Sequence, residues 1–367
     1  MFTVQGKYNS ATVYANSLEN SATGQLKALC NQEFVADSKL RIMPDAHAGA
    51  GCVVGTTMTI NDKVVPNLVG VDIGCGMEVV NIGACRVDFQ KLDNVIRKSV
   101  PSGFATRKTP HRFAGELELD NLRCGKAVNR QKAMNSIGTL GGGNHFIEIA
   151  KNEISGEHFL IIHSGSRQAG LQVANYHQQI AGNKRPEGVP FELAYLTGND
   201  FDAYVRDMNI MVAYAKLNRK AIADEILKGM KWKDRDSFTT IHNYLDSENM
   251  ILRKGAVSSQ RGERLLIPMN MRDGSLLCEG LGNSDWNYSA PHGAGRVFSR
   301  TDAKNQITLT QFKKDMEGIY SSCISRKTID ESPAAYKPMQ DILDRICDTV
   351  KVLAILKPVY NFKAGSE

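Results

Sequence analysis

The order of strand-like and helix-like segments is the feature that most limits the folds open to this chain. Short apolar runs punctuated by glycine, typical of strands, crowd its first third, as in GAGCVVGTTMTI and LVGVDIGCGMEVVNIG. Helical periodicity appears later, and strands and helices do not alternate regularly. A doubly wound α/β sheet requires that alternation, so we predict an α+β fold with mixed β-sheets and surrounding helices.

Three later segments carry clear element signals. HFLIIHSGSRQAGLQVANYHQQIAG, residues 158–182, predicts a buried strand, a Gly/Ser loop and a helix. Apolar residues at helical spacing predict a helix from Asp200 to about Leu227, with Gly229 as its stop signal. A further helix is expected to start at Pro338 and cover PMQDILDRICD, followed by a strand-like tail, VKVLAILKPVYNF.

The bulk properties are those of one globular domain, and we predict a single domain over residues 1–367. The sequence shows no internal repeat, low-complexity tract or Pro/Ser-rich linker. A net charge of +6 permits an RNA or nucleotide partner without requiring one. No apolar run has the length of a signal peptide or a membrane span. Eight cysteines form no CxxC pair, so we expect reduced thiols, a cytoplasmic protein and no membrane partner.

Ligand-type side chains beside glycine-rich backbone are the main chemical signal. Asp72 and Cys75 stand three residues apart among several glycines, which indicate a close backbone approach or a bend that aims side chains. Five histidines lie beside Gly, Ala, Asn or Ser: His47, His145, His163, His242 and His292. His111, His158 and His177 stand in more polar surroundings, and we expect them at the surface.

Taken singly, each of these residues more often fills a core or turn position than binds a metal. Together, one Asp, one Cys and three His suit a borderline metal or a pair of metals with a bridging thiolate. Zinc is the default for a Cys/His site, but a mixed carboxylate, imidazole and thiolate set serving phosphate chemistry can also hold Mn²⁺. The composition of the set does not choose between them.

The HSGSRQAG segment adds a possible anion site. A Gly/Ser loop between a strand and a helix start exposes backbone N–H groups that favour an anion, and Arg167 could add a forked contact to phosphate. An ordinary turn with an exposed Arg explains the segment equally well. The chain has no Walker A loop, and no GxGxxG opens a credible dinucleotide-binding unit.

In combination, the motifs resemble those of the RtcB-type RNA ligases. In chain order they are MPDAHAGAGCVVG, VDIGCGM, LGGGNHFIEI, HSGSR, HNY, RKGA, HGAGR, DESPAAYK and Lys363–Ala364–Gly365. The resemblance covers nearly the whole chain, and several motifs in one order are far more specific than any one motif.

That family joins an RNA end bearing a 3′-phosphate or 2′,3′-cyclic phosphate to a 5′-hydroxyl end, using GTP and Mn²⁺. The resemblance implies that His292 is the nucleophile that becomes guanylylated and that Arg167 grips RNA phosphate. It also implies that two metal ions, Mn²⁺ or Zn²⁺, share Cys75 as a bridge, with the ligand set Asp72, Cys75, His145, His163 and His242.

The resemblance further places the GTP contacts along the chain, with Glu148 and Lys363 reading the guanine edge. The full set of implied GTP contacts is Asn144, His145, Phe146, Ile147, Glu148, His242, Asn243, Pro268, Met269, Asn270, Met271, Ser275, His292, Gly293, Ala294, Gly295, Tyr336 and Lys363.

One turn departs from the family pattern: IPMNMRDGS stands where relatives carry IPGSMG. Met269 in place of Gly would block any positive φ that the turn required, and Asn270 replaces a Ser hydroxyl. The chain also resembles a compact bacterial subgroup associated with a release-factor-like partner. This implies RNA repair rather than routine tRNA splicing.

Two alternatives stay open at this point. A metal-dependent phosphoesterase could use the same ligands to hydrolyse cyclic phosphate, although it would need neither His292 nor a guanine-reading Lys363. A non-catalytic RNA-binding paralogue would be expected to lack some of the six core residues, and all six are present. The basic stretch TRKTPHR could contact RNA, but a solvated loop explains it better.

Overall fold

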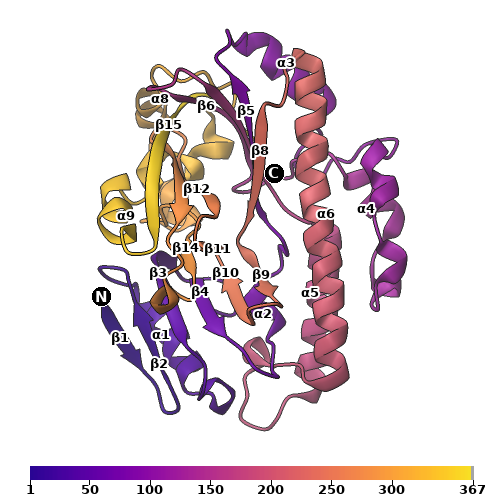
Figure 1. The fold of residues 1–367 in the computed structure, drawn as a ribbon, viewed down its shortest axis with the longest axis vertical. Coiled ribbons are helices and arrows are strands. Elements are labelled where there is room, and N and C mark those ends of the chain that lie inside the picture. Colours follow the sequence, from indigo (N-terminus) through magenta and orange to yellow (C-terminus); the bar gives the residue numbers. More distant parts are fainter. Residues whose placement is uncertain (365–367) are drawn as a thin grey trace.

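A computed structural model describes residues 1–364, so Gly365 of the Lys363–Ala364–Gly365 motif lies outside the described residues. Within them, two large β-sheets and a two-stranded ribbon are surrounded by helices (Figure 1). This arrangement confirms the predicted α+β class with mixed sheets. No helix in this part of the chain combines the length and the apolar character that crossing a membrane requires.

The first sheet has six strands in the order β1-β2-β3-β4-β10-β9. Its strands β2 and β3 run parallel, while its other neighbours are antiparallel. Helix α1 (Asn20–Cys30) makes the crossover that this parallel pair needs. The strand bounds are β1 (Phe2–Gln5), β2 (Ser10–Val13), β3 (Leu40–His47), β4 (Val54–Thr59), β9 (Asn243–Asp246) and β10 (Ile251–Lys254).

The second sheet has seven antiparallel strands in the order β12-β13-β15-β6-β7-β5-β8. Its strands are β5 (Gly76–Gly83), β6 (Phe146–Asn152), β7 (His158–Ser164), β8 (Asp236–Ile241), β12 (Arg264–Asn270), β13 (Gly274–Gly280) and β15 (Val350–Lys363). Strands β11 (Ala256–Ser258) and β14 (Ser289–Pro291) form the ribbon. The strand-like tail is therefore confirmed as β15.

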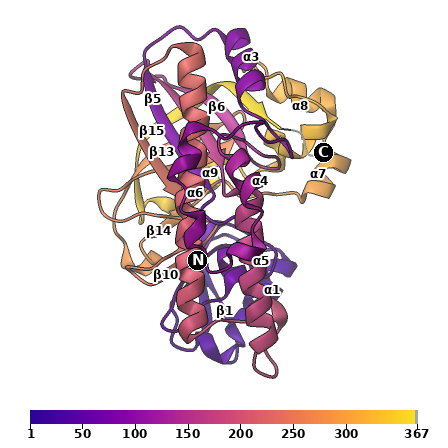
Figure 2. The same cartoon turned by 90° about the vertical axis from the view of Figure 1, so that its right-hand side faces the viewer.

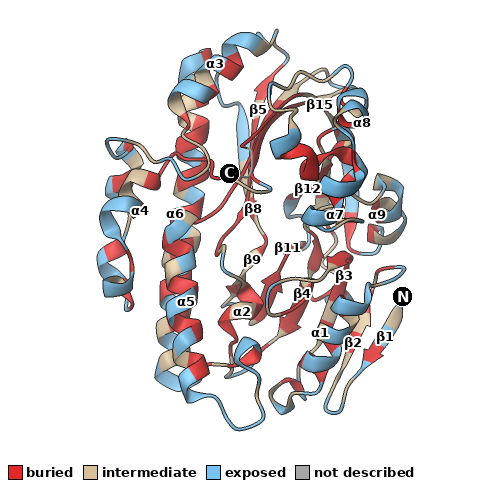
Figure 3. Cartoon of the chain, turned by 180° about the vertical axis from the view of Figure 1, so that it is seen from behind, coloured by how far each residue is buried: buried red, intermediate tan, exposed pale blue. Residues whose placement is uncertain are grey.

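Helices lie on both sides of these sheets, as the opposed views in Figures 1 and 3 show. On one side are α3 (Phe89–Ser99), α4 (Arg130–Ser136), α5 (Arg167–Lys184) and the long α6 (Gly198–Met230); on the other are α7 (Arg300–Gln306), α8 (Leu309–Asp315) and α9 (Met339–Ile346). Helix α2 (Pro66–Val69) is a single turn. Short 3₁₀ segments are η1 (Glu33–Val35), η2 (Arg112–Glu116), η3 (Leu119–Asn121), η4 (Gly125–Ala127), η5 (Phe191–Leu193), η6 (Ser284–Trp286), η7 (Arg326–Glu331) and η8 (Pro333–Ala335).

Helix α6 runs along both sheets and packs against β5, β7 and β9 (Figure 2). It confirms the helix expected from Asp200 to Leu227, but the predicted stop is wrong. Gly229 lies inside the helix, where a Cβ would crowd Val95 of α3, so glycine allows the two helices to approach. The helix ends at Lys231, whose left-handed backbone (φ 58°) closes it.

Two of the three histidines expected at the surface are buried, so that expectation is wrong for them. His111 is 6% exposed, and its Nδ1 accepts the N–H of Phe113. His177 is 1% exposed and faces Asp207 of α6, with 2.8 Å between Nε2 and the carboxylate. In both cases a polar partner inside the fold compensates for burial of the imidazole.

The two large sheets meet at one residue. Strand β8 of the second sheet ends at Ile241 and β9 of the first sheet begins at Asn243, so at this crossing His242 is the single residue between them. Beside this junction, the fully buried guanidinium of Arg219 on α6 donates to the carbonyls of Gly74 and Ser164 and to Thr239 Oγ1. Arg219 thus ties α6 to the strand ends that lie around His242.

Candidate active site

Four strand ends gather the ligand-type side chains at one edge of the second sheet. Cys75 precedes β5, His145 precedes β6, His163 lies near the end of β7, and His242 follows β8. Since these strands are antiparallel neighbours, a start beside an end places residues at the same edge. The register confirms it, because Met77 and Phe146 both pair with His163.

The side chains at this edge approach one another closely. The Sγ of Cys75 lies 3.5 Å from His145 Nε2 and 3.2 Å from His163 Nε2. Asp72 Oδ2 is 3.1 Å from His145 Nε2, and the Nε2 atoms of His163 and His242 are 3.5 Å apart. Two groups able to hold a metal ion result, Asp72/Cys75/His145 and Cys75/His163/His242, and they share Cys75.

Backbone carbonyls orient two of the imidazoles. His145 Nδ1 is 2.9 Å from the Leu140 carbonyl, and His163 Nδ1 is 3.2 Å from the Asn144 carbonyl. A carbonyl only accepts, so Nδ1 carries the proton in both rings and Nε2 presents a lone pair toward Cys75. This is the arrangement that metal-binding histidines use.

The protonation states also suit a cation. Burial, reinforced by neighbouring imidazoles, holds the pKa of His163 and of His242 well below the ordinary value, so both rings are neutral. Burial opposes ionisation of Asp72, but the neighbouring imidazole of His145 and the charge of Arg167 outweigh it and keep its pKa low. Burial and the charge of Asp72 raise the pKa of the Cys75 thiol, which would therefore release its proton on binding a cation.

Glycine is required at two positions around the cluster. A Cβ on Gly165, in the HSGSR loop, would overlap the Asp72 carboxylate, and a Cβ on Gly76 would overlap the Thr240 carbonyl. The absence of a side chain at Gly165 lets Asp72 reach His145, and its absence at Gly76 lets β5 pair with β8. The glycines near Asp72 and Cys75 therefore mark close backbone approach, as the sequence indicated.

His292 stands next to the cluster and is held by Asp45. The two imidazole rings of His292 and His242 have centroids 4.9 Å apart. Asp45, which is fully buried, places Oδ2 2.7 Å from His292 Nδ1 and accepts the backbone N–H groups of His292 and Gly293 at 3.2 and 3.1 Å. The sequence reasoning did not single out Asp45, although it stands two residues before His47 in PDAHAGAG.

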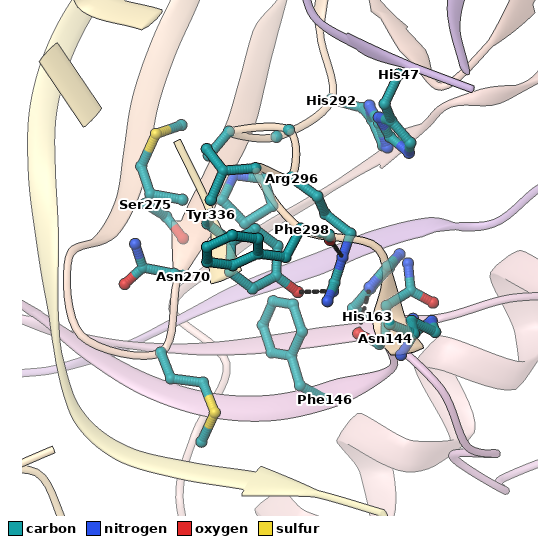
Figure 4. A pocket seen from close by; sticks show the side chains of 18 of the residues that line it. His47, Asn144, Phe146, His163, Asn270, Ser275, His292, Arg296, Phe298 and Tyr336 are labelled. Carbon is teal, nitrogen blue, oxygen red and sulfur yellow. Dashed lines mark hydrogen bonds between the residues drawn. The ribbon is translucent and has the colours of Figure 1, made fainter. Parts of the chain in front are cut away.

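A cavity of about 560 Å³ opens beside His292. Figure 4 shows His47 and His292 side by side at one end, with Asn270 and Ser275 at the other and Phe146, Phe298 and Tyr336 between. Of the expected GTP contacts, those lining it are Asn144, Phe146, Glu148, Pro268, Met269, Asn270, Met271, Ser275, His292, Gly293, Ala294, Gly295, Tyr336 and Lys363.

Four expected GTP contacts do not line the cavity. His145 and His242 belong to the ligand cluster behind it. The side chain of Ile147 is fully buried in the apolar core that includes Ile162 and Ile222. Asn243 Nδ2 donates to the Asp72 carbonyl at 3.2 Å, so it braces the turn that carries Asp72 and Cys75.

The cavity wall around Glu148 and Lys363 is charged and buried. Burial raises the pKa of Glu148 to about 8, although Asn361 donates to its carboxylate, and its Oε1 has no partner among the described residues. Lys363 Nζ lies 2.5 Å from Glu331, whose other oxygen faces Arg296 and Arg300. Burial raises the pKa of Glu331, but Lys363, Arg300 and the hydrogen bond from Tyr336 outweigh it and lower that pKa to about 2.

Sequence reasoning missed Arg296 and Arg300, which line the cavity, and Glu331, which pairs with both. Glu331 lies in DESPAAYK and Arg296 ends HGAGR, so both stood in motifs that had been noted. Their charge type alone did not show that they would face one another, because 35 residues separate Arg296 from Glu331.

The IPMNMRDGS turn adopts a conformation that its residues tolerate. None of residues 268–273 has a positive φ, so the expected conflict with a methionine side chain is wrong for this chain. Met269 and Met271 are 3% and 2% exposed and pack into apolar clusters. Asn270 closes the turn, because its Oδ1 accepts the N–H groups of Arg272 and Asp273.

Arg167 begins α5 and contacts the cluster from outside the cavity. Its Nη1 lies 3.3 Å from His145 Nδ1, and its Nη2 donates to the Gly103 carbonyl at 3.4 Å. Its backbone has φ 57°, a costly conformation for a residue with a side chain. Contacts to Thr139, His145 and Gly103 hold the guanidinium against the ligand cluster and offset this cost.

A third group of ligand-type side chains, Cys124, His177 and Asp207, lies apart between α5 and α6. Here the protein itself satisfies the carboxylate: Asp207 accepts the N–H groups of Arg123 and Cys124 as well as His177 Nε2. The group therefore connects segment 112–129 to both helices and explains why His177 is buried.

The fold and the cluster thus define an α+β protein in which a paired ligand site, suited to cations, adjoins a polar cavity. The family profile described as "tRNA-splicing ligase RtcB" matches residues 25–125 and 111–364. The chain belongs to the RtcB family.

Curated relatives align over most of their length. The "RNA-splicing ligase RtcB" of Escherichia coli K12 is 30% identical over 94% of this chain and 95% of its own length. The "RNA-splicing ligase RtcB2" of a second E. coli strain is 28% identical, covering 88% of this chain and 86% of its own. The "tRNA-splicing ligase RtcB" of Aeropyrum pernix is 28% identical, covering 86% and 84%.

Proposed function

We propose that this chain is a GTP-dependent RNA ligase that joins 3′-phosphate or 2′,3′-cyclic phosphate ends to 5′-hydroxyl ends through a covalent His292–GMP intermediate. RNA ligation is the activity that family membership supports. The observation that carries the finer proposal is the position of His292, which lies between the ligand cluster and a cavity with a charged far wall.

The cavity offers the groups that a guanine base needs. Glu148 Oε1 and Ser275 Oγ are buried without a partner among the described residues, so a ligand has polar atoms left to satisfy. The N1–H and N2–H groups of guanine would donate to Glu148, and Lys363 would donate to O6. Phe146 and Tyr336 supply flat apolar surfaces for the ring.

The cluster fits a pair of divalent cations. Its imidazoles include the neutral rings of His163 and His242, its carboxylate is ionised, and Cys75 is common to both groups. Mn²⁺, or Zn²⁺ with the same donors, would neutralise the triphosphate and stabilise charge on the α-phosphoryl oxygens. The residues that would hold the ions are Asp72, Cys75, His145, His163 and His242.

In the proposed sequence, His292 Nε2 attacks the α-phosphorus of GTP, the bond to pyrophosphate breaks, and His292–GMP remains. The Asp45 carboxylate, whose Oδ2 lies 2.7 Å from Nδ1, would favour the tautomer that carries its proton on Nδ1 and leaves the Nε2 lone pair free. An oxygen of the RNA 3′-phosphate then takes the GMP, and His292 is released. Finally the 5′-hydroxyl attacks that phosphate and GMP leaves. Where the RNA end carries a cyclic phosphate, that phosphate is hydrolysed to a 3′-phosphate before these steps. Arg167, which lies beside His145, would bind an RNA phosphate.

The test is incubation with α-³²P-GTP and Mn²⁺, followed by a denaturing gel. Wild-type protein should carry an acid-labile, alkali-stable label typical of a phosphoramidate. His292→Ala should lose the label while its metal content stays near the wild-type value. His158→Ala is the matched control, because His158 lies at the opposite end of β7 and should label normally.

A labelled His292→Ala variant would remove His292 from its role. An unlabelled wild-type protein with metal bound would instead favour the phosphoesterase alternative, which the cluster alone could support. The cellular role that we propose is RNA repair, with a possible release-factor-like partner. It predicts that the enzyme rejoins nicked stem–loops at least as fast as paired tRNA halves.

A further inference from the structure

Phe104 is exposed to an unusual degree for an aromatic side chain. It is 82% exposed, about twice the value for Tyr8, Tyr176 or Phe191, which are between 38% and 40% exposed. Large apolar rings left in water are costly and often mark a binding site.

The backbone around Phe104 is firmly held. Phe104 sits in a tight turn in which the Ala105 N–H donates to the Ser102 carbonyl at 3.2 Å. The turn is pinned to the loop before His145, since the Gly103 N–H donates to the Gly141 carbonyl at 2.9 Å. The ring is therefore presented by an ordered element, which reduces the entropy lost when it binds a ligand.

The same turn contacts the candidate active site. Arg167 donates to the carbonyl of Gly103, the residue next to Phe104, and its other Nη atom lies against His145. A succession of contacts thus runs from His292 through His242, His163, His145 and Arg167 to the Phe104 turn. The turn is at the opposite end of this succession from the GTP cavity.

Basic side chains lie near Phe104, although two of the three are paired with carboxylates of α6. Segment 104–112 contains Arg107, Lys108 and Arg112 and no acidic residue. Arg107 and Arg112 form ion pairs with Glu225 and Asp224 of α6, and Lys108 is exposed. An exposed ring near Lys108 and the Arg167 guanidinium combines the aromatic and cationic groups with which proteins hold single-stranded RNA.

We propose that Phe104 is a stacking platform for a nucleobase of the RNA end that enters the ligand cluster. The terminal phosphate or hydroxyl would lie near Arg167 and His145, and a base of the same strand would stack on the Phe104 ring. This inference rests on the proposed RNA ligase function and adds a residue to its substrate site.

The experiment measures fluorescence anisotropy of labelled six-nucleotide RNAs, one ending in a 3′-phosphate and one beginning with a 5′-hydroxyl, at fixed salt. Phe104→Ala should weaken binding of at least one strand by about 5- to 50-fold. Phe104→Leu should be as weak, because it keeps an apolar surface without an aromatic face. Phe104→Trp should retain affinity, and its added fluorescence should be quenched by RNA.

Ile154→Ala is the matched control, because Ile154 is 94% exposed at the turn between β6 and β7 and should not affect RNA binding. Labelling with GTP should stay unchanged in every variant. The strand that loses affinity identifies which end stacks on Phe104. Equal RNA affinity of wild type and Phe104→Ala would overturn this inference alone, whereas a wild-type protein that binds neither RNA would overturn the proposed function.

Discussion

At the scale of single residues, the site depends on buried carboxyl groups whose surroundings set their contacts. Asp45 is fully buried against His292, and Glu148 is buried with one free oxygen. Neither state follows from residue type, because both are produced by what the fold places around the carboxylate. Two predictions belong to this scale.

Asp45→Asn should slow guanylylation by at least ~100-fold. A carboxylate 2.7 Å from His292 Nδ1 favours the tautomer with its lone pair on Nε2. An amide can instead donate its N–H to Nδ1 and hold the unreactive tautomer. The measurement is the single-turnover rate of label transfer from GTP. Melting temperature and metal content should match wild type, and an unchanged rate would show that Asp45 does not orient the nucleophile.

Guanosine should bind more tightly as the pH rises toward 8, by about tenfold per pH unit below that value. The pKa of Glu148 is about 8 in the free protein, so its carboxyl is mostly protonated at pH 6. Guanine donates its N–H groups to the ionised carboxylate of Glu148. The population of that form, and with it the affinity for guanosine, therefore increases with pH until ionisation is complete. Calorimetry with the nucleoside avoids any contribution from metal binding, and Glu148→Gln should give weak, pH-independent affinity. A flat wild-type profile would remove Glu148 from base recognition.

At the scale of elements, sequence patterns predicted the helices and strands that depend on local residue preferences. Helical periodicity located α6 and α9, and the apolar tail became β15. The helix end at Lys231 and the burial of His177 escaped prediction, because each depends on a neighbouring element: α3 accommodates Gly229, and α6 supplies Asp207.

The candidate site shows the same division. The residues around Asp72 and Cys75 were predicted because glycines mark backbone bends. The contact between Lys363 and Glu331 could not be predicted in this way, because it forms only when the fold brings the end of β15 against η7. Motif resemblance identified many members of the site, while only the fold showed which of them face one another.

Gly165→Ala should deplete metal with little loss of secondary structure. Its Cβ would overlap the Asp72 carboxylate and push it away from His145. We expect metal content to fall by at least half, measured by mass spectrometry of the dialysed protein. Gly24→Ala is the control, since Gly24 lies in helix α1 with open space around it and should be neutral or slightly stabilising, by about 0.5–1 kcal/mol. Normal metal content in Gly165→Ala would show that Asp72 is not a ligand.

At the scale of the whole molecule, the cluster is where the two sheets are joined. Its ligand-type residues lie just before β5 and β6, within β7 of the second sheet, and at His242, the residue that leads into β9 of the first sheet. A cation bound there would connect both sheets, and α6 is already tied to the same edge through Arg219. Binding of a cation at the cluster should therefore stabilise both sheets against unfolding.

Removal of metal should lower the melting temperature of the whole protein in one step. Each ion at 100 times its dissociation constant stabilises a folded protein by about 2.7 kcal/mol, which for a chain of this length corresponds to a shift of about 3–4 °C per ion. Calorimetry of chelator-treated protein with and without added Mn²⁺ measures this shift, and Cys75→Ser should show little of it. A single transition that moves as a unit would support one domain over residues 1–367. Two transitions, with only one responding to metal, would show that the sheets unfold independently and that the cluster stabilises just one of them.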